Sequence, residues 1–191
     1  MTHLTRYYMY KRIKNCLVEN DYYPMEEKIL GISGINNFYP FINMQNVKLL
    51  DVDYPEVDMQ NLPYENNSFD FVISDQVIEH LEDPKKAIKE SFRVLNKGGI
   101  AIHTTCFINY IHLFPGDFWR FSPAALRHLC KDFSEILCCE SWGNRIAILF
   151  CFISDKLRSL RIPEMKWSVR RYLATYNEER YPIVTWVVAK K

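Results

Sequence analysis

The sequence predicts an α/β domain built on a doubly wound, mostly parallel sheet of about seven strands. Several short segments are almost continuously apolar, as is typical of strands that are buried on both faces of a parallel sheet. Amphipathic segments lie between them, and this alternation is typical of doubly wound folds. The last apolar segment follows a long stretch of chain, so we expect it to join the sheet as an antiparallel edge strand.

The individual elements follow from apolar runs and from the residues that start and stop helices. Strands are predicted at 28–33, 47–52, 56–59 (very short), 69–74, 100–104, 134–139 and 181–189, and helices at 5–18, 84–95, 122–131 and 146–160. Two helices begin with a capping residue followed by proline, at Asp83-Pro84 and Ser122-Pro123. The first of these helices should end at Lys97-Gly98-Gly99.

Length and composition indicate a single domain over residues 1–191. It would consist of a helical extension at 1–24, a core at 28–140, and a helix with the last strand at 146–191. The net charge of +1 argues against a nucleic-acid partner. The six cysteines include no C-x-x-C pair or zinc-like cluster, so we expect reduced thiols, no metal and a cytoplasmic location. The longest apolar run, 146–153, is far shorter than the ~20 residues of a spanning helix.

One block of the chain carries a specific pattern. It reads DMQNLPY at 58–64, NNSFDFVIS at 66–74, VIEHL at 77–81 and RVLNKGG at 93–99. This order and spacing resemble the class I S-adenosylmethionine (SAM)-dependent methyltransferases, in particular their type 11-like members. The resemblance is nearly gap-free over 58–104 and extends, with the flanking strands, over about 28–140. It implies a Rossmann-like sheet with SAM as the cofactor.

The resemblance also implies which residues would bind SAM. The loop after the first strand, with Gly31, Ser33 and Gly34, would line the methionine part. Either Asp51 or Asp53, at the end of the second strand, would bind the ribose hydroxyls, since an acid at this position commonly does so in doubly wound folds. Asp58 and Met59 would face the adenine. The sulfonium and the substrate would be bordered by Ser74, Asp75 and Gln76.

The glycine loop departs from the family pattern. Gly31 stands where the family has an acid, and Ser33 and Ile35 stand where it has glycines. A degenerate, non-catalytic module that binds a partner is therefore an alternative to an enzyme. A nicotinamide-dependent oxidoreductase is disfavoured, because no G-x-G-x-x-G follows the first strand.

A second, local resemblance lies at 112–123, which reads HLFPGDFWRFSP. It is similar to a segment of bacterial methyltransferases often encoded beside polysaccharide genes. Asp117 and Arg120 could orient a substrate hydroxyl or an anionic group, and Trp119 could stack on a sugar ring. Alternatively, Arg120 closes the loop onto Asp117 and has a structural role.

The predicted function is methyl transfer from SAM to a small acceptor, a hydroxyl of a sugar or glycan intermediate. His112 is the first candidate for the general base, with Asp117 and Arg120 as its catalytic partners; His80 and His103 are weaker candidates. The apolar segment 146–153, followed by basic residues, favours a sheet-covering helix over a membrane-surface contact. The aromatic content of 15% leaves a homodimer interface open.

Overall fold

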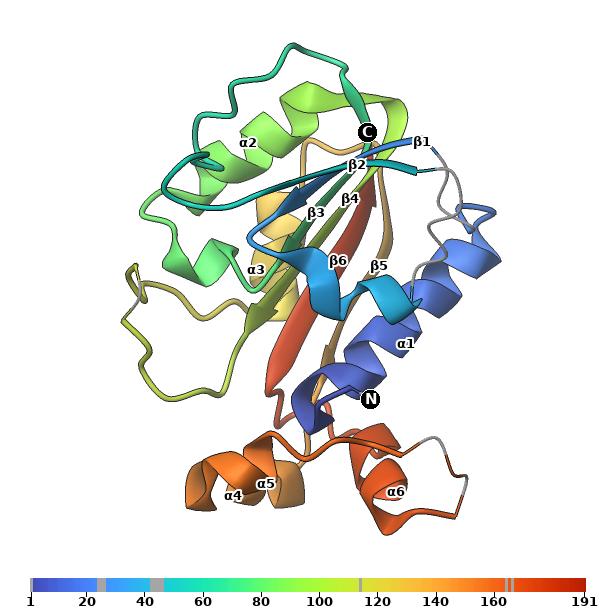
Figure 1. The fold of residues 1–191 in the computed structure, drawn as a ribbon, viewed down its shortest axis with the longest axis vertical. Coiled ribbons are helices and arrows are strands. Elements are labelled where there is room, and N and C mark those ends of the chain that lie inside the picture. Colours follow the sequence, from blue (N-terminus) through green and yellow to red (C-terminus); the bar gives the residue numbers. More distant parts are fainter. Residues whose placement is uncertain (1, 24–26, 42–46, 114, 164, 166) are drawn as a thin grey trace.

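The computed structural model describes residues 2–23, 27–41, 47–113, 115–163, 165 and 167–191. Six strands form one sheet in the order β2-β1-β3-β4-β6-β5 (Figure 1). They are β1 (Glu27–Ile32), β2 (Val47–Val52), β3 (Phe69–Asp75), β4 (Leu95–Cys106), β5 (Glu135–Trp142) and β6 (Val184–Lys190). Strands β1 to β4 pair in parallel, and β6 runs antiparallel to both of its neighbours. The predicted Rossmann-like α/β class is confirmed.

The sheet differs from the prediction in two respects. Residues 56–59 form no strand, because the backbone N–H of Val57 bonds to the Asp53 carbonyl (2.9 Å) and that of Asn61 to the Asp58 carbonyl (2.9 Å). These bonds close local turns. The last strand is not at the edge: β6 lies between β4 and β5, and its residues from Val184 to Ala189 are all buried. An apolar strand of this kind buries the most apolar surface in the interior of a sheet that is covered on both faces.

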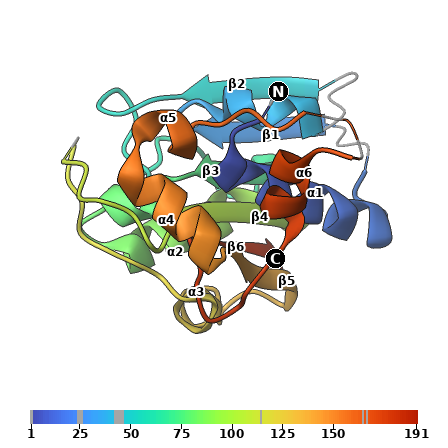
Figure 2. The ribbon, with the colours of Figure 1, turned by 90° about the horizontal axis from the view of Figure 1, so that it is seen from below.

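Helices cover both faces of the sheet. The described helices are α1 (Leu4–Glu19), α2 (Pro84–Val94), α3 (Pro123–Leu129), α4 (Arg145–Ile153), α5 (Asp155–Arg158) and α6 (Val169–Thr175), with single 3-10 turns η1 (Ile35–Asn37), η2 (Tyr39–Phe41) and η3 (Ile78–His80). One buried cluster joins α1 to the sheet, and a second joins α2 and α3 to it. Helices α4, α5 and α6 lie together beyond one end of the sheet (Figures 1 and 2).

The predicted caps are present. Asp83 accepts a hydrogen bond from the N–H of Lys86 (3.0 Å) at the start of α2, and Ser122 accepts one from Ala125 (3.3 Å) at the start of α3. The helix predicted at 146–160 is interrupted, however. Ser154 has extended backbone angles (φ −162°, ψ 136°) and caps α5, so the segment forms two helices, and α6 was not predicted.

The described part of the chain between β1 and β2 holds only the single turns η1 and η2, where many doubly wound folds have a full helix. Residue 24, at the predicted end of the helical extension, lies outside the described residues, as does Phe114 of the segment 112–123. Within the described part of the chain, no helix combines the length and apolarity needed to cross a membrane.

His103 is buried in the middle of β4, where its Nδ1 lies 2.8 Å from the Ser74 hydroxyl. Its Nε2 makes no hydrogen bond to another described residue. Burial lowers the pKa of His103 to about 3, because the apolar surroundings disfavour the imidazolium. This position rules His103 out as a base that contacts a ligand.

We expect His103 to make the protein sensitive to acid. Below a pH of about 6.5 the unfolded chain binds a proton at this histidine and the folded chain does not, so stability is lost as pH falls toward 3. Between pH 7.5 and 5 this linkage costs about 2 kcal/mol of the free energy of unfolding. Urea unfolding at both pH values should show a smaller difference in His103→Asn. An equal difference in both proteins would contradict the expectation.

Candidate active site

A cleft of about 520 Å³ opens at the carboxyl ends of β1 and β2 and beside the segment that follows β3. It is lined by Ile32, Ser33, Asp53, Tyr54, Val57, Asp58, Met59, Gln60, Gln76, Val77, His80, Leu81, Glu82, Pro115, Gly116 and Phe118. Ligands of doubly wound sheets bind at this edge, and the volume is that of an ordinary small-molecule site. Several of the residues predicted to bind the cofactor lie at this edge.

The loop after β1 turns sharply at two consecutive left-handed residues, Ser33 (φ 61°) and Gly34 (φ 71°). Ser33 lines the cleft, and its N–H donates to the Val52 carbonyl (2.7 Å), which fixes the loop against β2. At Gly31 a side chain is excluded for another reason. A Cβ there would lie 2.9 Å from Asp51 Oδ1 and 2.9 Å from Ile35. The altered glycine motif thus still forms a tight turn.

The two acids at the end of β2 have different surroundings. Asp53 lines the cleft. Asp51 does not line it; its Oδ2 accepts a hydrogen bond from the Tyr39 hydroxyl (3.2 Å), and its Oδ1 occupies the space beside Gly31. Of the two acids that the sequence left open, the structure brings Asp53 to the cleft.

The predicted adenine-facing pair also lines the cleft. Met59 is buried and offers an apolar surface, while Asp58 Oδ1 accepts a hydrogen bond from the N–H of Gln60 (2.8 Å). Gln60 was not predicted. Its Oε1 accepts from the N–H of Asp83 (2.8 Å), so it ties the floor of the cleft to the start of α2. No sequence motif marks this contact, because it joins segments that are distant in the chain.

The three residues predicted beside the sulfonium point in different directions. Ser74 is fully buried against His103, away from the cleft. Asp75 turns toward α1 and accepts hydrogen bonds from the Tyr10 hydroxyl and from the Thr104 hydroxyl. Only Gln76, with φ 61°, lines the cleft. The pKa of the Tyr10 hydroxyl is raised, by burial first and then by the charge of Asp75.

A second cavity of about 230 Å³ adjoins the cleft. Gln76 and His80 line both spaces, so the two meet at these side chains. The other residues around the second cavity are Thr5, Arg6, Cys106, Ile108, Asn109, His112, Cys151, Arg158, Ile183 and Val184. Helices α1, α4 and α5 thus contribute to the site, and the sequence pattern gave no signal for this.

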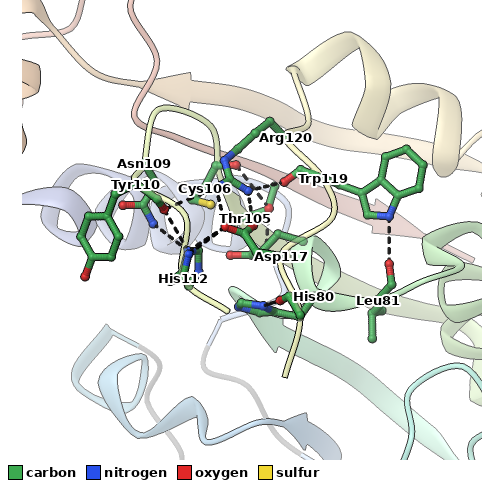
Figure 3. A network of polar contacts seen from close by, with 12 residues as sticks. His80, Leu81, Thr105, Cys106, Asn109, Tyr110, His112, Asp117, Trp119 and Arg120 are labelled. Carbon is green, nitrogen blue, oxygen red and sulfur yellow. Dashed lines mark hydrogen bonds and ion pairs between the residues drawn. The ribbon is translucent and has the colours of Figure 1, made fainter. Parts of the chain in front are cut away.

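The segment 107–121 closes over this region (Figure 3). The Asp117 side chain is 1% exposed and accepts hydrogen bonds from Arg120 and from the N–H of His112 (2.9 Å). Arg120 also donates to the carbonyl of Trp119 (2.7 Å). The Arg120 guanidinium holds the pKa of Asp117 well below its usual range. Neither Asp117 nor Arg120 lines the cleft or the second cavity, and their contacts are those of a loop-closing pair.

The two histidines that line the second cavity contact each other. The His80 and His112 rings meet edge to face, with centroids 4.7 Å apart. His80 Nδ1 hydrogen-bonds to the Gly116 carbonyl, and His112 Nδ1 lies 3.2 Å from Asp117 Oδ2. Trp119, predicted to stack on a sugar, donates its indole N–H to the Leu81 carbonyl (2.8 Å), stacks on Phe121 and lines neither cavity.

Comparisons with known proteins show that part of this chain is similar to methyltransferases. Residues 22–103 match a family described as "Methyltransferase domain". Over 78 residues the chain is 37% identical to a ubiquinone/menaquinone biosynthesis C-methyltransferase of Campylobacter jejuni, covering 41% of this chain and 33% of that protein. A 2-methyl-6-phytyl-1,4-hydroquinone methyltransferase of Oryza sativa is 36% identical over 85 residues, which are 41% of this chain and 24% of that protein. The chain thus matches a third or less of the length of these relatives.

Solved structures agree in fold. A phosphoethanolamine N-methyltransferase of Haemonchus contortus has a TM-score of 0.58 at 15% identity, covering 94% of this chain and 52% of that one. A SAM-dependent methyltransferase from Archaeoglobus fulgidus has a TM-score of 0.53 at 14% identity, covering 97% of both chains. The chain has the class I methyltransferase fold.

The turns between β2 and β3 bring Asp53 and Asp58 to one cleft. Gln76 and His80 line both the cleft and the second cavity, so a ligand in either space could contact these two side chains.

Proposed function

We propose that this chain binds SAM in the larger cleft and transfers its methyl group to a small acceptor in the adjoining cavity. The observation that carries the proposal is that Gln76 and His80 line both spaces. Group transfer by direct displacement needs the two reactants in line and in contact, and a shared wall between two cavities provides such a meeting point.

The cleft has the chemistry that SAM needs. The Asp53 carboxylate can accept hydrogen bonds from both ribose hydroxyls, and Met59 offers a polarizable surface to the adenine. Ser33 lines the cleft at the left-handed turn after β1, where it can contact the methionine part. Bound SAM supplies a methyl group that is activated by its sulfonium.

His112 is our candidate for the general base. It lines the acceptor cavity, and its Nδ1 faces the Asp117 carboxylate and the Tyr110 carbonyl, which leaves Nε2 to accept a proton. An acceptor hydroxyl would lose its proton to His112 as its oxygen bonds to the methyl carbon and the carbon–sulfur bond breaks. Asp117 and Arg120 act as positioning residues, because they hold the loop and the imidazole rather than the acceptor.

The acceptor that we favour is a hydroxyl of a sugar or glycan intermediate. The segment 112–123 supports it, through its resemblance to methyltransferases encoded beside polysaccharide genes. The two relatives named above on sequence identity are methyltransferases of quinone biosynthesis and of a hydroquinone, so a hydroquinone ring is the second candidate. The two candidate reactions differ in the atom that receives the methyl group, which is oxygen in a sugar and carbon in a hydroquinone ring. Analysis of the products after incubation with each acceptor class distinguishes O-methylation from C-methylation.

Calorimetric titration with S-adenosylhomocysteine (SAH) and SAM tests the cofactor step, with NADH as the control. We expect one site with a dissociation constant in the micromolar range and no binding of NADH. Such affinity corresponds to about −8 kcal/mol. Well-folded protein that binds neither SAM nor SAH would contradict the proposal and would favour the non-catalytic, partner-binding module.

A further inference from the structure

Three side chains that can bind a metal ion meet where the cleft and the second cavity join. Glu79 and His80 belong to η3, and His112 belongs to the loop after β4. One potential ligand atom from each lies within 4.8 Å of the others. Figure 3 shows His80 and His112 close together beneath the loop that carries Asp117 and Arg120.

Glu79 is the first reason to regard this cluster as a site. The residue is fully buried, and its Oε2 accepts a hydrogen bond from the Thr105 hydroxyl (2.9 Å). Its Oε1 is buried and has no hydrogen-bond partner among the described residues. Leaving a buried carboxylate oxygen unpartnered is costly, and such groups are normally paired with a donor or a cation.

The histidines are oriented in the way that metal ligands usually are. The contact of His80 Nδ1 with the Gly116 carbonyl requires the proton on Nδ1, because a carbonyl can only accept. His112 Nδ1 lies 3.2 Å from two acceptors, Asp117 Oδ2 and the Tyr110 carbonyl, and 3.4 Å from the amide nitrogen of Asn109, which is a donor. With the proton on Nδ1, each ring leaves its Nε2 lone pair free to bind a metal ion. Metal-binding histidines typically donate their other N–H to a carbonyl or a carboxylate in this manner.

Charged side chains of both signs surround the cluster. Three described carboxylates lie in this region, from Asp75, Glu79 and Asp117. Three guanidinium groups lie there as well: Arg6 lies 3.9 Å from Asp75, Arg120 pairs directly with Asp117, and Arg158 lines the second cavity. Within the described residues Glu79 forms no ion pair with any of them, so its Oε1 is available to a metal ion.

We infer that Glu79, His80 and His112 form a binding site for a divalent transition-metal ion such as Zn²⁺ or Co²⁺. Two imidazoles with one carboxylate are a ligand set for these ions, which bind at about 2.0–2.2 Å. The ligand atoms must approach one another further to reach such distances, so binding of the ion would draw His112 toward η3. The sequence indicated no metal, because that expectation rested on the spacing of cysteines, and His112 is distant in the chain from the adjacent Glu79 and His80.

The site goes beyond the proposed function, since binding of the ion needs neither SAM nor an acceptor. His80 and His112 line the second cavity, so an open coordination position would face the acceptor. A hydroxyl bound there would release its proton more readily. With the ion in place, His112 would be a ligand and could not also act as the base.

Titration of the metal-free protein with Co²⁺, followed by its visible absorption, tests the site directly. We expect one equivalent to bind with a dissociation constant of about 10 µM or below, to be displaced by Zn²⁺, and to require no SAM. His112→Ala and Glu79→Gln should weaken binding at least ~100-fold. His128→Ala, which removes an exposed histidine on α3, is the matched control and should bind as the parent does.

Two outcomes would overturn the inference. One is the absence of Co²⁺ binding at ~1 mM by protein that binds SAH or shows a cooperative thermal transition. The other is undiminished binding in His112→Ala, which would assign the ion to the thiols instead. Circular dichroism of each variant confirms folding. His112→Ala decides the question if Glu79→Gln does not fold, because His112 is only partly buried and lies on a loop.

Discussion

Substituting Gly143 by alanine is expected to destabilise the protein by about 3 kcal/mol or more, or to prevent folding. Gly143 connects β5 to α4 and lies directly against the chain that leads into β6. A Cβ at this position would lie 2.0 Å from the Tyr181 carbonyl oxygen and 2.6 Å from the Ile183 nitrogen. Both are backbone atoms, so no side chain can rotate away to relieve the clash.

The hydrogen bonds around Gly143 make a compensating shift costly. Its carbonyl accepts from the N–H of Glu178 (2.7 Å), and its own N–H donates to Asn177 Oδ1 (3.0 Å). Gly98→Ala is the matched control: φ is +80° there, but nothing lies within 4 Å of the added Cβ, so the expected cost is about 1 kcal/mol. Urea unfolding compares the two variants. A Gly143→Ala protein no less stable than Gly98→Ala would show that the two segments can separate.

The sequence predicted the parts of the fold that local chemistry decides. The caps at Asp83 and Ser122 begin helices where a side-chain oxygen can accept a free backbone N–H. Long-range effects explain the errors. The position of β6 depends on pairing with β4 and β5, and the interruption at Ser154 depends on how α4 and α5 pack beyond the sheet. Neither is encoded in the periodicity of its own segment.

The candidate site shows the same division. A motif identified the region after β3, and the structure brings Gln76 and His80 to the cleft. The motif did not reveal that Ser74 and Asp75 turn away from the cleft, because that depends on the partners His103 and Tyr10 from other elements. Contributions from α1, α4 and α5 to the second cavity could not be predicted, since no pattern within those helices marks them as part of a site.

Asp53→Ala is expected to weaken binding of SAH and SAM by about 10- to 100-fold, whereas Asp51→Ala leaves it within about twofold. Loss of hydrogen bonds to a charged acceptor costs about 1.5–3 kcal/mol, which corresponds to that range. Both acids lie at the end of β2 and are exposed, so both variants should fold. Calorimetric titration of the two proteins under identical conditions makes the comparison.

The pair of variants is informative because the two acids differ mainly in where their side chains lie. Asp53 lines the cleft, while Asp51 is held by Tyr39 beside Gly31. Equal weakening by both substitutions would mean that the loop between β1 and β2 acts as a unit and that Asp51 orders it through Tyr39. Weakening by Asp51→Ala alone would place the ribose on the other side of β2, which would contradict the assignment of the cleft. Tyr39→Phe separates these outcomes, since it removes the hydrogen bond to Asp51 and leaves both carboxylates in place.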